Sequence, residues 1–218
     1  VGWTAYEFLL SSVSPHGTAG SIAYTQSDFL PLIQIASLTG LFGITFIITL
    51  VPAGMAAALH VRGMKSSFLV LVIVVGVGLG ALTYGWLRIS RPMPGQPVRV
   101  GLVAIDSTIE HFNTTEREKA LGVLGTYGLV VADLARQGAQ IVVLPEKMVG
   151  VAEHYERDVF AFLSGLAQQE NVAIVAGLNR IGSEPHRNSA VVFSSDGAVL
   201  GEYDKVYPIP GLESEYRI

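Results

Sequence analysis

The chain has 218 residues, a formal net charge of −4 at pH 7 and no cysteine. The acidic balance argues against a nucleic-acid-binding protein, because no basic stripe is available to neutralise phosphates. The lack of cysteine excludes disulfides, thiolate metal sites and a cysteine nucleophile within these residues.

The first 90 residues predict a membrane region. Only 15% of the chain is charged, against about 25% in ordinary globular domains, and the deficit falls here. No charged side chain occurs in residues 29–59 or 66–87, and about 20 apolar residues suffice for a helix to cross a bilayer. We therefore predict transmembrane helices at about 29–59 and 66–87, the first opening at Pro31 and kinked at Pro52.

The segments before these helices read as membrane-surface structure. Residues 1–13 carry Trp3 and Tyr6, aromatic residues that gather at membrane interfaces, and predict a helix that ends in a Ser- and Gly-rich loop over 14–28. The chain starts at Val1 and has no basic segment before an apolar core, so we predict no signal peptide. We expect both chain ends to be cuts inside a longer protein.

The remaining residues predict an α/β domain. Residues 91–97 hold three prolines and read as a linker. Apolar strands are expected at 98–105, 141–144 and 172–178, and a hairpin at 189–203 turning at residues 195–197. Helices are expected at about 115–137, opened by a capping box of Thr115 and Glu118, and at 155–169. This order indicates helices layered on a sheet over residues 98–218.

Three charged residues are candidates for chemistry. Glu146 follows a buried strand, where α/β sheets place active sites, and an apolar wall there would raise its pKa, as a general base needs. Lys205 follows the last strand and could stabilise an oxyanion. Glu213 lies on a Pro/Gly loop beyond it. Each also has a structural reading: a helix-capping Glu, a solvated surface Lys and a water-facing Glu.

Nothing in the sequence indicates a metal or an organic cofactor. The five histidines, at 16, 60, 111, 154 and 186, are scattered and make no H-x-x-x-H or H-E-x-x-H pattern. No phosphate-binding glycine motif is present. We therefore expect no cofactor and no metal site.

Taken together, the motifs resemble the nitrilase, or carbon–nitrogen hydrolase, superfamily. They are Ile-Val-Val-Leu-Pro-Glu ending at Glu146, Asn-Ser-Ala-Val-Val-Phe starting at Asn188, and Gly-Glu-Tyr-Asp-Lys ending at Lys205. The resemblance implies the N-terminal part of an α-β-β-α sandwich, with Glu146 as the base and Lys205 as the stabilising lysine. It also implies a cysteine nucleophile, which in this family follows later than residue 218.

The membrane segment narrows the resemblance to bacterial apolipoprotein N-acyltransferases. Residues 3–7, 23–26 and 31–40 look like the stretch before their catalytic domain, and Glu213 matches an essential loop glutamate of that family. The resemblance implies acyl transfer from a phospholipid donor to the N-terminal cysteine of an apolipoprotein, through a cysteine thioester. This fragment, lacking the nucleophile, would then be inactive alone.

Some residues depart from that pattern. Lys147 after Glu146 is unusual, as are Ala-Ile-Asp at 104–106 and Val-Tyr-Pro-Ile-Pro-Gly-Leu-Glu after Lys205. They leave open a membrane-tethered amidase of the same superfamily and, more remotely, a non-catalytic membrane scaffold. Charge near the helix ends is close to a tie for orientation, with Arg62 and Lys65 at one end against Arg88 and Arg91 at the other. The family implies a multi-pass protein of the bacterial inner membrane with an extracytoplasmic catalytic domain.

Overall fold

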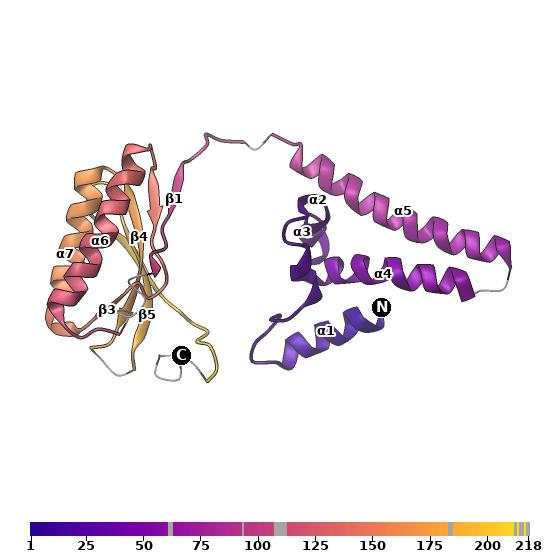
Figure 1. Cartoon of the computed structure of the whole chain (residues 1–218), viewed down its shortest axis with the longest axis horizontal. Helices are drawn as coiled ribbons and strands as arrows, with labels where there is room; N and C mark the ends of the chain where they lie inside the picture. The colour runs from indigo at the N-terminus through magenta and orange to yellow at the C-terminus, as the bar shows by residue number, and fades with distance from the viewer. Residues whose placement is uncertain are drawn as a thin grey trace. The chain divides into compact units, whose positions relative to one another are not determined.

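The computed structural model describes residues 1–60, 63–92, 94–106, 113–182, 185–211, 213 and 216. It divides into two compact units, Val1–Gly95 and Gln96–Ile218, and each is described by itself (Figure 1). The division falls inside the segment 91–97. Arg62 and His111 lie outside the described residues.

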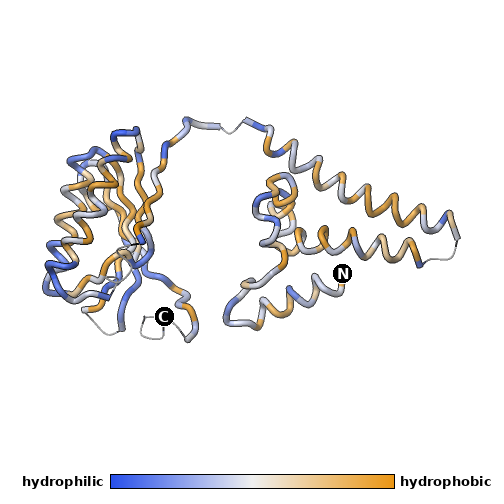
Figure 2. Tube along the Cα trace, in the orientation of Figure 1, coloured by the Kyte–Doolittle hydropathy of each residue, from blue (hydrophilic) through white to orange (hydrophobic). Residues whose placement is uncertain are grey.

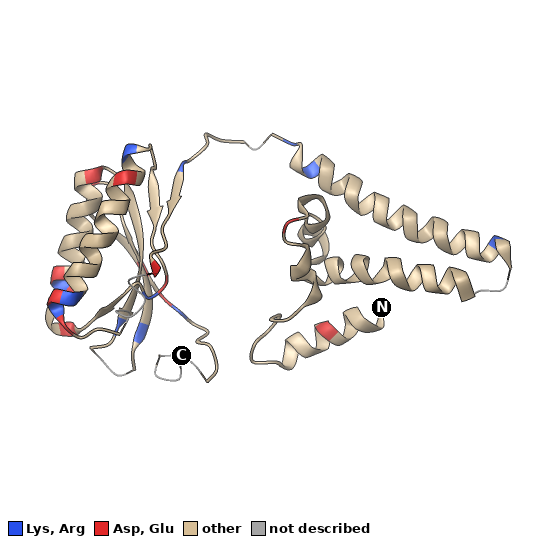
Figure 3. Cartoon of the chain, viewed as in Figure 1, with Lys and Arg blue, Asp and Glu red and all other residues tan. Residues whose placement is uncertain are grey.

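The first unit is helical. It contains α1 (Gly2–Val13), the 3-10 helix η1 (Ile22–Gln26), two short helices, α2 (Leu30–Ile33) and α3 (Ala36–Thr39), and two long ones, α4 (Leu41–His60) and α5 (Met64–Ile89). Both long helices have the length and apolar composition to cross a membrane. Figure 2 shows hydrophobic residues along their whole length, and Figure 3 shows how few charges they carry.

The expected single helix over residues 29–59 is wrong in its first third. Gly40 ends α3 with φ 65° and ψ −167°, a conformation open to glycine but not to residues with a side chain. The chain therefore forms α2 and α3 before α4 begins. Pro31 occupies the first turn of α2 and Pro52 lies within α4.

A buried carboxylate joins three segments of this unit. Glu7 of α1 accepts hydrogen bonds from Trp3 Nε1 (2.9 Å), Ser21 Oγ (2.8 Å), Ile22 N (3.0 Å) and Thr45 Oγ1 of α4 (2.7 Å). A buried charge is tolerated only when its hydrogen-bonding capacity is filled, and four donors fill it here. Glu7 therefore ties α1 to the loop before η1 and to α4.

The second unit is a six-stranded mixed sheet. Its strands are β1 (Val100–Leu102), β2 (Ile141–Val143), β3 (Val149–Val151), β4 (Ala173–Arg180), β5 (Arg187–Phe193) and β6 (Val199–Asp204). The order is β1-β2-β4-β5-β6, with β3 also paired to β4. β1, β2, β3 and β4 pair in parallel, whereas β4, β5 and β6 pair antiparallel.

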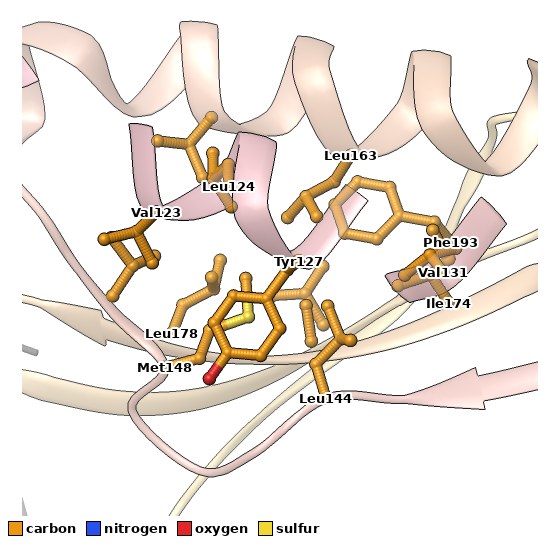
Figure 4. Close-up of a cluster of buried hydrophobic side chains, with 14 of the residues drawn as sticks. Val123, Leu124, Tyr127, Val131, Leu144, Met148, Leu163, Ile174, Leu178 and Phe193 are labelled. Atoms are coloured by element: carbon orange, nitrogen blue, oxygen red, sulfur yellow. The ribbon is translucent and has the colours of Figure 1, made fainter. Parts of the chain in front are cut away.

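Helices α6 (Arg117–Arg136) and α7 (Glu156–Glu170) cover one face of the sheet (Figure 1). Side chains from both helices and from the strands form a continuous apolar core between the layers (Figure 4). Leu102 and Tyr203, on the opposite face, are exposed. This helix-covered sheet has the α-β arrangement of one half of a nitrilase-like sandwich.

The predicted strands and helices are confirmed with three corrections. The strand expected over 98–105 is only three residues long, and β3 was not predicted. Thr115 does not cap α6: the N-cap is Glu116, without a side-chain cap bond. Instead, Glu116 N donates to Thr114 Oγ1 (3.2 Å), a local turn that competes with the capping box.

Candidate active site

Glu146, Lys205 and Glu213 come together at one end of the sheet. Glu146 follows β2, Lys205 follows β6, and Glu213 lies on the C-terminal segment. Lys205 Nζ lies 2.9 Å from Glu146 Oε1 and 2.8 Å from Glu213 Oε2. The lysine therefore bridges the two carboxylates, and the Glu213 side chain is only 4% exposed, which corrects the reading that it faces water.

Strand order explains why residues so far apart in sequence meet here. β2 and β4 are parallel, so their carboxyl ends lie at the same edge, and β5 and β6 return beside β4 as a hairpin. Period-two alternation places Asn179, Asn188 and Lys205 on the face of the sheet opposite the helices. Arg180 and Arg187 fall on the helix side, where Arg180 pairs with Glu156 and Glu202.

The loop that carries Glu146 is pressed onto β4. A Cβ built on Gly177 would lie 2.2 Å from Pro145 O and 2.7 Å from Glu146 Cα. Only glycine allows this approach of two backbones. Met148 N then donates to Gly177 O at 2.9 Å, which fixes the far side of the loop. Glu146 is thus positioned by backbone packing as well as by its own side-chain contacts.

Asn188, which sequence reasoning had noted only as part of a motif, is a member of the site. Its Nδ2 donates to Glu146 Oε1 at 2.5 Å and lies 3.4 Å from Glu213 Oε1. Counting back from the predicted turn at 195–197 places position 188 opposite 204, and the irregularity between Val192 and Phe193 shifts the pairing by one residue, so that Lys205 N donates to Asn188 O at 2.8 Å. The predicted hairpin was therefore the signal that could have placed Asn188 near Lys205, to within one residue.

A second lysine also enters the site. Lys147 Nζ lies 2.9 Å from Glu213 Oε1 and 4.8 Å from the centre of the Tyr216 ring. Tyr216 Oη donates to Asn179 Oδ1 (2.8 Å), and Asn179 Nδ2 donates to Asn113 Oδ1 (2.6 Å). No sequence pattern predicted these contacts, because the sequence around Glu213 and Tyr216 predicts no helix or strand.

The pKa of Glu146 is lowered, which corrects the expectation that an apolar wall raises it. The hydrogen bond from Lys205 has the largest effect and lowers the pKa, burial raises it, and the bond from Asn188 lowers it again. The side chain is 57% exposed, so the apolar wall is incomplete. Glu146 is therefore a carboxylate at neutral pH.

The other three charged groups are also held in their ionised forms. Burial would raise the pKa of Glu213, but hydrogen bonds from Lys205, Ile209 N and Lys147 hold it at about 2. Burial would lower the pKa values of Lys205 and Lys147, but Glu213 raises both, helped at Lys205 by Glu146. Among the described residues of the site, two carboxylates and two ammonium groups therefore form one charge-balanced cluster.

Within the part of the chain that the structure describes, no three His, Asp or Glu residues are grouped to hold a metal ion. The chemistry that the described cluster can offer is proton acceptance by a carboxylate and stabilisation of negative charge by a neighbouring ammonium.

Comparison with known proteins identifies the fold of the second unit. Residues 99–217, more than half of the chain, match the family model described as Carbon-nitrogen hydrolase. The chain belongs to the carbon–nitrogen hydrolase family. Residues 1–54 match the model of the Apolipoprotein N-acyltransferase N-terminal domain.

The chain is also similar to individual known proteins. An Apolipoprotein N-acyltransferase of Geobacter metallireducens is 29% identical over 207 residues, which cover 87% of this chain and 38% of that protein. The chain thus spans about two fifths of this relative's length. Similar structures include a carbon–nitrogen hydrolase from Helicobacter pylori (24% identity, 55% of this chain, 43% of that chain, TM-score 0.42) and an amidase from Nesterenkonia (21%, 58%, 49%, 0.44).

Proposed function

We propose that this chain is part of an apolipoprotein N-acyltransferase, which moves an acyl chain from a phospholipid to the N-terminal cysteine of a lipoprotein. The observation that carries the proposal is the bridged cluster of Glu146, Lys205 and Glu213. It occurs in a chain whose residues 1–54 match the N-terminal domain of apolipoprotein N-acyltransferases, the name that the relative also carries. The chain contains no cysteine, so the proposal requires a nucleophile from outside these residues.

The proposed first half-reaction forms a thioester. Glu146, ionised at neutral pH, takes the proton of the cysteine thiol, and the sulfur attacks the carbonyl carbon of the phospholipid ester. Lys205 stabilises the oxyanion of the tetrahedral intermediate. The intermediate collapses with cleavage of the C–O bond, and the proton on Glu146 passes to the departing alcohol of the lysophospholipid.

The second half-reaction consumes the thioester. The amino group of the lipoprotein's N-terminal cysteine attacks the acyl carbon, and Glu146 takes a proton from it. Cleavage of the C–S bond then releases an amide, and the proton on Glu146 passes to the sulfur and regenerates the thiol. The acceptor nitrogen gains the acyl group that the phospholipid lost, so no oxidant, reductant or organic cofactor is needed.

The location follows from the same proposal. The candidate spans α4 and α5 would belong to a multi-pass protein of the bacterial inner membrane, with the second unit on the extracytoplasmic side. Arg157 is exposed on α7, so an Arg157→Cys variant reports this orientation. Labelling by an impermeant maleimide in intact spheroplasts is expected, and protection there would contradict the orientation.

Activity is best tested in the full-length gene product, assayed with phospholipid vesicles and an apolipoprotein peptide. Glu146→Gln and Lys205→Met are each expected to abolish acylation, with roughly a 100-fold to 1,000-fold loss for removal of an oxyanion-stabilising group. Full activity in Glu146→Gln would overturn the assignment. The unusual residues after Lys205 favour a tethered amidase as the second candidate, and release of ammonia from small amides without use of lipid would establish it.

A further inference from the structure

Glu213 is shared by two lysines from different parts of the sheet. Lys147, from the loop after β2, holds Oε1 at 2.9 Å, and Lys205, from the end of β6, holds Oε2 at 2.8 Å. Ile209 N adds a third hydrogen bond to Oε2 at 2.7 Å. Each carboxylate oxygen is thus occupied by a separate ammonium, in a side chain almost wholly removed from water.

The backbone at Lys147 is arranged for this contact at an energetic cost. Lys147 has φ 50°, in the left-handed region that is unfavourable for residues other than Gly, Asn and Asp. The loop cannot relax toward β4, because Gly177 already touches Pro145 and Glu146. A lysine kept in this conformation, with a side chain only 21% exposed, suggests that its ammonium has a role at the site.

Charge balance indicates what that role is. Without Lys147, one ammonium would serve two carboxylates, and the cluster would carry one net negative charge where an oxyanion has to form. With Lys147, the four groups sum to zero, and Lys205 does not have to neutralise Glu213 alone. Opposite charges this close act strongly in a partly buried site.

We propose that Lys147 is a positioning residue that pairs with Oε1 of Glu213, so that Lys205 stays aligned on Glu146 and available to a developing negative charge. This inference rests on the proposed function, because it assigns Lys147 a part in the same reaction. Lys147 acts through Glu213 and Lys205 and is not required to touch substrate.

The test compares three variants at position 147 in the full-length gene product. Lys147→Met removes the charge and keeps the length, whereas Lys147→Asn removes it in a residue that accepts a left-handed backbone. Both are expected to lower kcat by about 10- to 100-fold, the scale of a misplaced catalytic group, with KM unchanged. Lys147→Arg is expected to restore most of the activity.

A pH profile separates positioning from simple stability. Loss of Lys147 removes a donor that lowers the pKa of Glu213, so Glu213 becomes protonated at a higher pH. The acidic limb of the kcat–pH profile is therefore expected to shift to higher pH. Lys119→Met is the matched control, because Lys119 pairs with Glu116 on the exposed surface of α6 at 2.7 Å. This control is expected to retain both kcat and the pH profile.

The outcomes distinguish this inference from the proposed function. If Glu146→Gln and Lys205→Met abolish acylation while Lys147→Met and Lys147→Asn keep the wild-type kcat and pH profile, the role of Lys147 is refuted and the function stands. If Glu146→Gln stays active, the proposed function fails. The pairing of Lys147 with Glu213 is then tested separately, by carboxyl-carbon NMR of Glu213. The pKa of Glu213 should rise from about 2 in Lys147→Met, and an unchanged titration would refute the pairing of Glu213 with both lysines.

Discussion

Replacing Gly177 by alanine tests whether backbone packing sets the position of Glu146. The new Cβ would lie 2.2 Å from Pro145 O, whereas ordinary contact begins at 3.4 Å, so the loop has to move by about 1 Å, the difference between these values. All three nearest atoms belong to the backbone and cannot rotate away. Overpacking of this kind costs about 1–3 kcal/mol, and a displacement of about 1 Å at a reacting group costs about 100-fold in rate.

The assay measures hydrogen exchange of the β4 amides and acyl transfer by the full-length protein. Gly177→Ala is expected to speed exchange and lower kcat together. Gly165→Ala on α7 is the matched control, because nothing lies within 4 Å of its Cβ and alanine favours a helix over glycine by about 0.5–1 kcal/mol. Wild-type exchange and activity in Gly177→Ala would show that the loop does not rest on β4 as described.

Three further changes test the charge cluster and the helical unit. The pKa of Glu213 is depressed from 4.5 to about 2, so its ionised form stabilises the folded state above pH 4.5. This contribution is lost as the pH falls toward 2 and amounts to at most about 3 kcal/mol. Glu213→Gln should flatten this pH dependence when acid unfolding is monitored by hydrogen exchange. Glu7→Ala leaves buried donors unpaired at about 1–3 kcal/mol each and should lower the thermal midpoint in detergent. Gly85→Ala places a Cβ 1.7 Å from Pro31 O and should separate α2 from α5, giving faster proteolysis near residue 31, whereas Gly80→Ala, with nothing within 4 Å, should not.

Much of the fold could be predicted because its elements follow local patterns. α5, α6 and α7 have uninterrupted helical runs, and the β5–β6 hairpin has a strong turn signal at residues 195–197. The break at Gly40 was not predicted, because a lone glycine in an apolar run is also typical of a membrane helix. β3 escaped because Val149–Val151 is three residues long, too short for a periodic signal, and exists through its pairing with β4.

Part of the candidate site was predictable from position along the chain, but its electrostatic arrangement was not. Glu146 and Lys205 each follow a strand, so position alone brings them to one edge of the sheet. The two lysines on Glu213 depend on the path of the segment after Lys205, for which the sequence predicts no strand or helix. The predicted direction of the pKa shift at Glu146 was wrong for a similar reason. The shift depends on the hydrogen bonds that Lys205 and Asn188 donate to the carboxylate, and not on the apolar strand before it.

The lowered pKa of Glu146 changes how a base could work in this site. A carboxylate held by Lys205 is ionised and ready at neutral pH, but it is a weak acceptor for a thiol proton, whose pKa is about 8.5 when unperturbed. Since the Lys205 hydrogen bond has the largest effect on that pKa, any shift of Lys205 toward a developing oxyanion would loosen its hold and make Glu146 a stronger base. Oxyanion formation and proton transfer would then reinforce each other. On the proposed role, Lys147 would stay paired with Oε1 of Glu213 while Lys205 turns toward the new charge.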